Sequence, residues 1–165
     1  MAQVGSVGVH KLAGMLAGDD GLPSSVAAIG EAAGVRLQPI GTAQIATQNV
    51  TAELAERSEI VRYPSVHVYC EKLSNRFREK FRTFSGQAHL VLEIRVSLDR
   101  LEGLEQQVQL YADAVTRVLE QRRGDWGGGL FYGGGYEVVF GAAKRGGKNY
   151  LQTATITLDV DVSIQ

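Results

Sequence analysis

The chain has 165 residues, a net charge of −1 and an isoelectric point of about 6.3, which suits one domain with a single hydrophobic core. A charge this close to zero provides no overall field that would attract nucleic acid or an anionic membrane, so any such contact must come from a local patch. The single cysteine, Cys70, excludes an internal disulfide and a multi-cysteine metal site.

No apolar run approaches the roughly 20 residues that a membrane-spanning helix requires. The N-terminal stretch "MAQVGSVGVHKLAG" also lacks the apolar block of a secretory signal. We therefore expect the protein to stay in the cytoplasm in which it is made.

The first part of the chain, residues 1–58, is rich in small residues and poor in bulky apolar ones. Its apolar side chains predict two short helices separated by a turn at "GDDGLPSS": Val7, Leu12 and Leu16, then Val26, Ile29 and Ala33. Because this apolar stripe is thin, we expect these helices to rest on a larger core or on a neighbouring molecule.

Two segments with period-two alternation follow and predict strands. In "VRYPSVHVYC", Val66, Val68 and Cys70 share one face and Ser65, His67 and Tyr69 share the other, with Pro64 at the start of the strand. In "GQAHLVLEIRVSL", the inward side chains are those of Ala88, Leu90, Leu92, Ile94 and Val96, while Glu93 and Arg95 face outward.

The segment between these strands, "SNRFREKFRTFS", is long for a hairpin loop and strongly basic. If it is extended, Arg76, Arg78, Lys80 and Arg82 point to one side, and Phe77, Glu79 and Phe81 to the other. Such a group of cations suits contact with a phosphate backbone or an acidic protein face, although charged loop tips also simply keep proteins soluble.

An amphipathic helix comes next. Asp99 and Glu102 have capping-box spacing, and "QRRGD" places arginines and then a glycine at the helix end. One stripe at three- and four-residue steps predicts the buried side: Leu101, Leu104, Val108, Tyr111, Ala112, Val115 and Leu119.

Two glycine triplets then lie in "GDWGGGLFYGGGYEVVFG". They follow a helix instead of preceding one, and no Gly-Lys-Ser/Thr is present, which argues against a phosphate-binding loop. The aromatic side chains of Trp126, Phe131 and Tyr132 among the glycines favour either a flexible connector or a docking loop that orders against another surface.

The end of the chain reads as two strands around the turn "KRGGKN", which carries Lys144, Arg145 and Lys148. The last strand alternates strictly, with Ala154, Ile156, Leu158, Val160, Val162 and Ile164 on one face and Thr153, Thr155, Thr157, Asp159 and Asp161 on the other. We therefore expect an α+β domain over residues 1–165 with its core in 60–164: a mainly antiparallel sheet of about four strands, covered on one face by the long helix, with short N-terminal helices.

Little in the sequence indicates catalysis or a cofactor. Asp159 and Asp161 share a strand face, but two carboxylates without a third ligand make a poor metal site. His67 and Cys70 point to opposite faces of their strand, and His10 and His89 have no partner that spacing identifies. We expect no metal, no cofactor and no enzymatic activity.

The order of the parts resembles a known family. "YPSVHVYC", "SGQAHLVLEIRVS" and "LEGLEQQVQLYADAVTRVLEQ", followed by two closing strands, are similar over residues 60–164 to the tail terminator (tail-completion) proteins of long-tailed bacteriophages. The resemblance implies a small α+β protein that assembles in the host cytoplasm as a hexameric ring on the finished tail tube. Such a ring stops tube polymerisation, receives the filled head through its neck proteins and lets DNA pass, and no catalytic residue is implied.

A ring requires head-to-tail interfaces. The candidate interface residues are Trp126, Phe131, Tyr132, Asp159 and Asp161, and the candidates to face the DNA in the lumen or a partner are the seven cations of the two basic segments. Other interpretations stay open: another neck component, such as a head-completion or connector subunit, a tail-tube subunit, a small nucleic-acid-binding α+β module, or an enzyme that uses the glycine segment as a lid.

Overall fold

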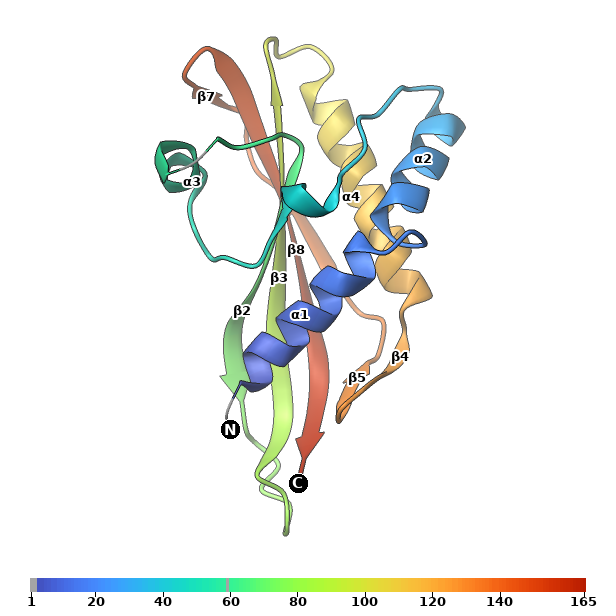
Figure 1. The fold of residues 1–165 in the computed structure, drawn as a ribbon, viewed down its shortest axis with the longest axis vertical. Helices are drawn as coiled ribbons and strands as arrows, with labels where there is room; N and C mark the ends of the chain where they lie inside the picture. The colour runs from blue at the N-terminus through green and yellow to red at the C-terminus, as the bar shows by residue number, and fades with distance from the viewer. Residues whose placement is uncertain (1–2, 59) are drawn as a thin grey trace.

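Three long antiparallel strands form the centre of the computed structural model, which describes residues 3–58 and 60–165 (Figure 1). They are β2 (Ser65–Ser74), β3 (Phe84–Leu98) and β8 (Asn149–Ile164). β3 lies between the other two and pairs with β8 along its entire length, from Phe84 opposite Ile164 to Leu98 opposite Tyr150. The alternating side chains expected to point inward from β3 and β8 are buried, apart from the half-buried Ile164 at the strand end.

Short strands complete the sheet. On the far side of β8, β5 (Leu130–Tyr132), β6 (Glu137–Phe140) and β7 (Lys144–Gly146) pair with it one after another. β4 (Gly124–Gly127) extends the sheet beyond β5, and β1 (Ile45–Ala46) runs parallel to β2. The α+β class is confirmed, but the expectation of about four strands is wrong, because the glycine segment forms a hairpin and the strand opposite β8 is broken into pieces.

One face of the sheet carries the helical layer. α1 (Val4–Ala17) lies across β2 and β3, α4 (Leu104–Gln121) lies on β3 and β8, and α2 (Leu22–Ala33) packs on α4 (Figure 1). The buried Ser25 hydroxyl of α2 donates to the Ala114 carbonyl at 2.6 Å. The cover is therefore shared between α4 and the N-terminal helices, whereas the sequence indicated the long helix alone.

Glycines let α1 lie close to the sheet although it has few large side chains. A Cβ at Gly5 would lie 3.1 Å from the Cβ and Sγ of Cys70, and one at Gly8 would contact Leu90 at 3.7 Å. The buried stripe consists of Val4, Gly5, Gly8, Val9, Leu12 and Leu16. Val7, which the sequence placed on this stripe, is 40% exposed, because the stripe is built around the glycines.

Helix α4 begins later than its sequence indicated. Gly103, with φ 81°, is the residue before the first turn, and no side chain caps the helix. Asp99 and Glu102 therefore do not form a capping box, and Leu101 is 57% exposed. The rest of the expected stripe is buried: Leu104, Val108, Tyr111, Ala112, Val115 and Leu119.

The segment between α2 and β2 crosses to the other side of the sheet, which we call the outer face. It contains a 3-10 turn at Thr42–Gln44, then β1, then α3 (Ala52–Ser58). The carbonyl of Val50 accepts a hydrogen bond from the outward-facing Arg95, so this segment covers the outer face near the Leu98 end of β3. Within the described residues, no helix is both long and apolar enough to cross a membrane.

Candidate functional site

Toward the Leu98 end, the outer face is held together by a buried arginine. Arg95 is 2% exposed, and its guanidinium lies 2.7 Å from a Glu93 carboxylate oxygen and 3.2 Å from the His67 ring. It also donates to the Val50 carbonyl. The sequence correctly placed Arg95 and Glu93 on the face away from the core, but the segment before α3 covers them, so Arg95 anchors that segment and is not presented to a partner.

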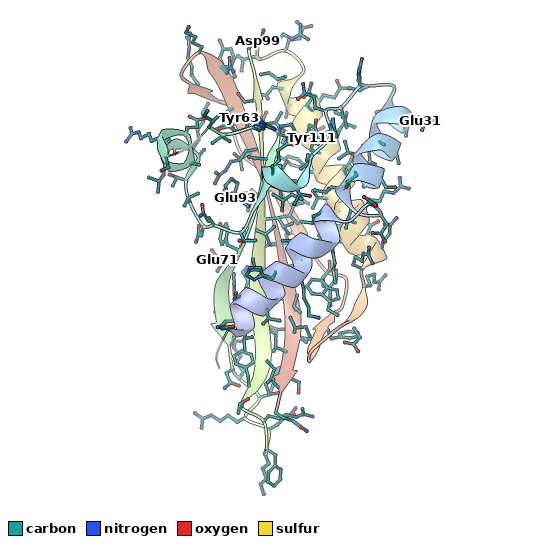
Figure 2. The ribbon with its side chains drawn as sticks, viewed as in Figure 1. Glu31, Tyr63, Glu71, Glu93, Asp99 and Tyr111 are labelled. Carbon is teal, nitrogen blue, oxygen red and sulfur yellow. The ribbon has the colours of Figure 1, made fainter. Side chains whose placement is uncertain are left out.

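A second polar group lies further along the same face. His89 contacts Asp159 through Nδ1 at 2.6 Å and Glu71 through Nε2 at 3.4 Å, which joins side chains from β3, β8 and β2. The sequence indicated no partner for His89, because cross-strand neighbours depend on the register of the sheet. In Figure 2, the label of Glu93 shows the position of the Arg95 group along the sheet, and the label of Glu71 shows the position of the His89 group.

Tyr69 belongs to the first of these groups. Its hydroxyl donates to Glu93 Oε1 at 2.9 Å, and burial together with this hydrogen bond raises the pKa of Tyr69 to about 12. The hydroxyl therefore remains a donor at neutral pH.

Beside His89 the outer face is hollowed by what we call the acidic groove. It measures about 360 Å³, lies between β3, β8 and the segment before β6, and is lined by Gln87, His89, Gly133, Gly135, Tyr136, Glu137, Thr157, Asp159 and Asp161. Both aspartates singled out in the sequence lie in it. Asp161 accepts a hydrogen bond from Gln87 Nε2 at 3.0 Å, and Glu137, Asp159 and Asp161 are exposed. In the described part of the chain, no group of three or more His, Cys, Asp or Glu side chains is arranged to hold a metal ion.

The loop between β2 and β3, residues 75–83, is the first basic segment, and we call it the basic finger. It extends beyond the end of the sheet (Figure 1). The segment is a loop and is not extended, because Arg78 and Phe81 have positive φ values of 34° and 65° and turn the chain, so the two-sided arrangement of an extended segment does not apply. Its four cations are exposed, and so are its aromatics, with Phe77 at 61% and Phe81 at 93%.

The second basic segment has Lys144 and Arg145 in β7 and Lys148 in the turn that joins β7 to β8, and we call it the basic turn. All three side chains are exposed, and the Arg145 guanidinium lies 5.9 Å from the centre of the Tyr150 ring. The basic turn is level with Leu98, whereas the basic finger joins β3 at Phe84. With 15 residues in β3, the two clusters are about 45 Å apart, so they do not form one patch.

The first glycine triplet makes a tight hairpin between β4 and β5. Gly127, Gly128 and Gly129 all have positive φ, and a Cβ at Gly129 would lie 2.2 Å from the Ser163 carbonyl oxygen. This part of the glycine segment is thus a fixed hairpin, and its chain geometry accounts for Gly127, Gly128 and Gly129.

The aromatic residues of this hairpin divide between core and surface. Trp126 is 7% exposed and Tyr132 is fully buried, with their rings 5.5 Å apart, and the Trp126 indole donates to the Arg122 carbonyl at 2.7 Å. Phe131 is 50% exposed and lies opposite Asp161 on the outer face. Of the three aromatic candidates for an interface, only Phe131 is exposed.

Sequence comparisons add no assignment to this arrangement. No protein-family model matches the chain, and no curated protein matches it.

Proposed function

We propose that this chain is a structural virion protein, the tail terminator of a long-tailed bacteriophage. In this role it forms a ring at the head-proximal end of the tail tube, stops tube polymerisation and provides the surface to which the head joins. The proposal combines the resemblance of residues 60–164 to that family with the distribution of exposed apolar side chains on the structure.

That distribution is the observation that carries the proposal. Large apolar side chains are exposed at several places, among them Phe77 and Phe81 on the basic finger, Phe131 beside the acidic groove, and Val139 and Phe140 on the edge strand β6. Apolar side chains that cluster on the surface mark contact sites, and a closed ring needs two different contact surfaces on each subunit. The positions of these side chains suit a subunit that contacts more than one neighbour.

The two other classes of function fit the geometry less well. A nucleic-acid-binding module that works alone would be expected to gather its cations into one footprint, and here they lie at opposite ends of the sheet. A lid over an active site would need a mobile glycine segment, whereas Trp126 and Tyr132 fix this one to the core.

In a ring, the basic turn is suited to the DNA channel. Lys144, Arg145 and Lys148 are exposed on a short hairpin, and a few cations of this kind contact phosphates without reading bases. Contacts of that type hold DNA weakly enough to let it slide.

The test is a tube-capping experiment with the tail-tube protein encoded by the same genome. The tube protein is polymerised with and without the full chain, and tube lengths and end structures are measured by electron microscopy. We expect shorter tubes that carry a ring at one end. As a matched variant, Phe131→Ser together with Val139→Ser removes two exposed side chains and leaves the core intact, and we expect it to cap poorly.

The other outcomes separate the alternatives. Tubes of unchanged length with bare ends would refute the terminator role. Long tubes formed by this chain alone would identify a tail-tube subunit, and binding to the head connector but not to the tube would identify another neck component.

A further inference from the structure

The basic finger is anchored at its base and projects apolar and cationic side chains from its tip. Asn75 Oδ1 accepts a hydrogen bond from the Ser85 amide at 2.9 Å, and the Thr83 amide donates to the Ile164 carbonyl at 2.9 Å. Between these anchors, Phe81 is 93% exposed and has a left-handed backbone, which is unfavourable for a bulky side chain. A segment held in this way is suited to insert its tip into another surface.

The finger and the acidic groove are complementary in charge. The finger carries Arg76, Arg78, Lys80 and Arg82 against the single carboxylate of Glu79, a net charge of +3. The groove carries the carboxylates of Glu137, Asp159 and Asp161. A chain whose net charge is only −1 therefore concentrates opposite charges in two separate places.

Both surfaces also contain exposed aromatic side chains. Phe131 lies across from Asp161 at the side of the groove and is 50% exposed, and Tyr136 lines the groove. The finger contributes Phe77 and Phe81. Interfaces commonly combine such aromatic anchors with charges at the rim.

The tip of the finger lies away from the groove of its own chain. Arg76, at the base of the finger, lines a hollow beside the groove together with His89 and Asp159, but the rest of the finger continues past the Phe84 end of β3 (Figure 1). We propose that the basic finger of one copy docks into the acidic groove of the next copy. This inference rests on the proposed function, since it names the two surfaces that would join ring subunits.

A contact of this kind is head-to-tail, because each copy presents a finger on one side and a groove on another. It also assigns the two basic segments different roles. The finger binds a neighbouring subunit, and the basic turn at the other end of the sheet contacts DNA.

Charge reversal tests the pairing with the full chain. A finger variant carries Arg78→Glu and Lys80→Glu, and a groove variant carries Glu137→Lys and Asp161→Lys. The control variant, Lys144→Glu with Arg145→Glu, makes the same change of charge in the basic turn. Size-exclusion chromatography with light scattering measures the mass of each across a range of concentrations, against the 17.8 kDa of one chain.

We expect the wild-type and control chains to form multimers, and the finger and groove variants each to associate at least about tenfold more weakly. An equimolar mixture of the two variants should recover the multimer, because each finger then meets a groove of opposite charge. Phe81→Ser should also weaken association without unfolding the chain, since that side chain is almost fully exposed.

Four results would overturn the pairing. The wild-type chain could stay monomeric at about 1 mM, or a finger or groove variant could have the same mass in solution as the wild type. The mixture of the two variants could stay monomeric, or Phe81→Ser could associate as strongly as the wild type. If the chain binds a DNA duplex in a salt-sensitive manner, and the finger variant loses this binding but associates with itself as the wild type does, the finger binds nucleic acid and not a neighbouring subunit. The tube-capping experiment is independent of this test. If the chain caps tubes but the finger and groove substitutions do not change its self-association, the pairing is refuted and the terminator role still stands.

Discussion

At the scale of single residues, Arg95 shows how burial can change the role of a polar side chain. Its guanidinium contacts Glu93, His67 and the Val50 carbonyl, and almost none of it is exposed. A buried charge that loses its partner is costly, because neither water nor a counter-ion replaces the contact. Arg95 therefore joins the segment before α3 to the sheet.

We predict that Arg95→Ala lowers the free energy of unfolding by about 3 kcal/mol, because it leaves the Glu93 carboxylate beside an empty space. Urea denaturation measures the change. Arg100→Ala is the control, since Arg100 is exposed and its removal should change stability by less than about 0.5 kcal/mol. Equal stability of the two variants would show that the Arg95 contacts contribute nothing.

The sequence identified which residues face outward but not what they contact. Period-two alternation correctly placed Arg95 on the outer face and Ala88 toward the core. It gave His89 no partner, because Glu71 and Asp159 reach it from two other strands, and pairing between distant strands leaves no local pattern.

At the scale of elements, long strands and short ones differ in how well the sequence reveals them. β3 and β8 contain 15 and 16 residues of alternating polarity, and both were expected. β4 and β5 contain four and three residues, and two of the four in β4 are glycines, so the alternation is too short to recognise in the sequence. The start of α4 was also misplaced, because Gly103 begins the helix without a side-chain cap.

The glycine hairpin supports a prediction at this scale. Gly129→Ala should lower the free energy of unfolding by about 2 kcal/mol or more, because φ is 83° there and the added Cβ meets the Ser163 carbonyl at 2.2 Å. Gly135→Ala is the matched control, since nothing lies within 4 Å of its Cβ position. Thermal unfolding of both variants decides the matter, and equal melting temperatures would contradict this account of the hairpin.

At the scale of the whole molecule, the arrangement of β3 and β8 separates the two basic segments. Each segment immediately precedes one of these strands, and antiparallel pairing places the starts of the two strands at opposite ends of the sheet. The sequence does not reveal that β3 pairs with β8. For this reason it proposes the cations of both segments as candidates for the same surface. In Figure 2, Asp99 marks the end of the molecule opposite the finger.

This arrangement also makes the molecule elongated (Figure 1). A compact domain of 165 residues has a radius of gyration of about 15 Å, and we predict a clearly larger value for the monomer. Small-angle X-ray scattering on the finger variant, which we expect to be monomeric, measures it without interference from multimers. A value of about 15 Å or less would contradict the extended sheet and finger.

The central place of β8 has a consequence for biosynthesis. Among the described residues, β1 to β7 leave the ribosome before β8, which joins β3 to β5, β6 and β7. Until residues 149–164 emerge, the nascent chain exposes one full edge of β3 and the apolar side chains that β8 later covers. Newly made copies should therefore depend on chaperones during translation and be most prone to aggregate just before synthesis of this segment is complete.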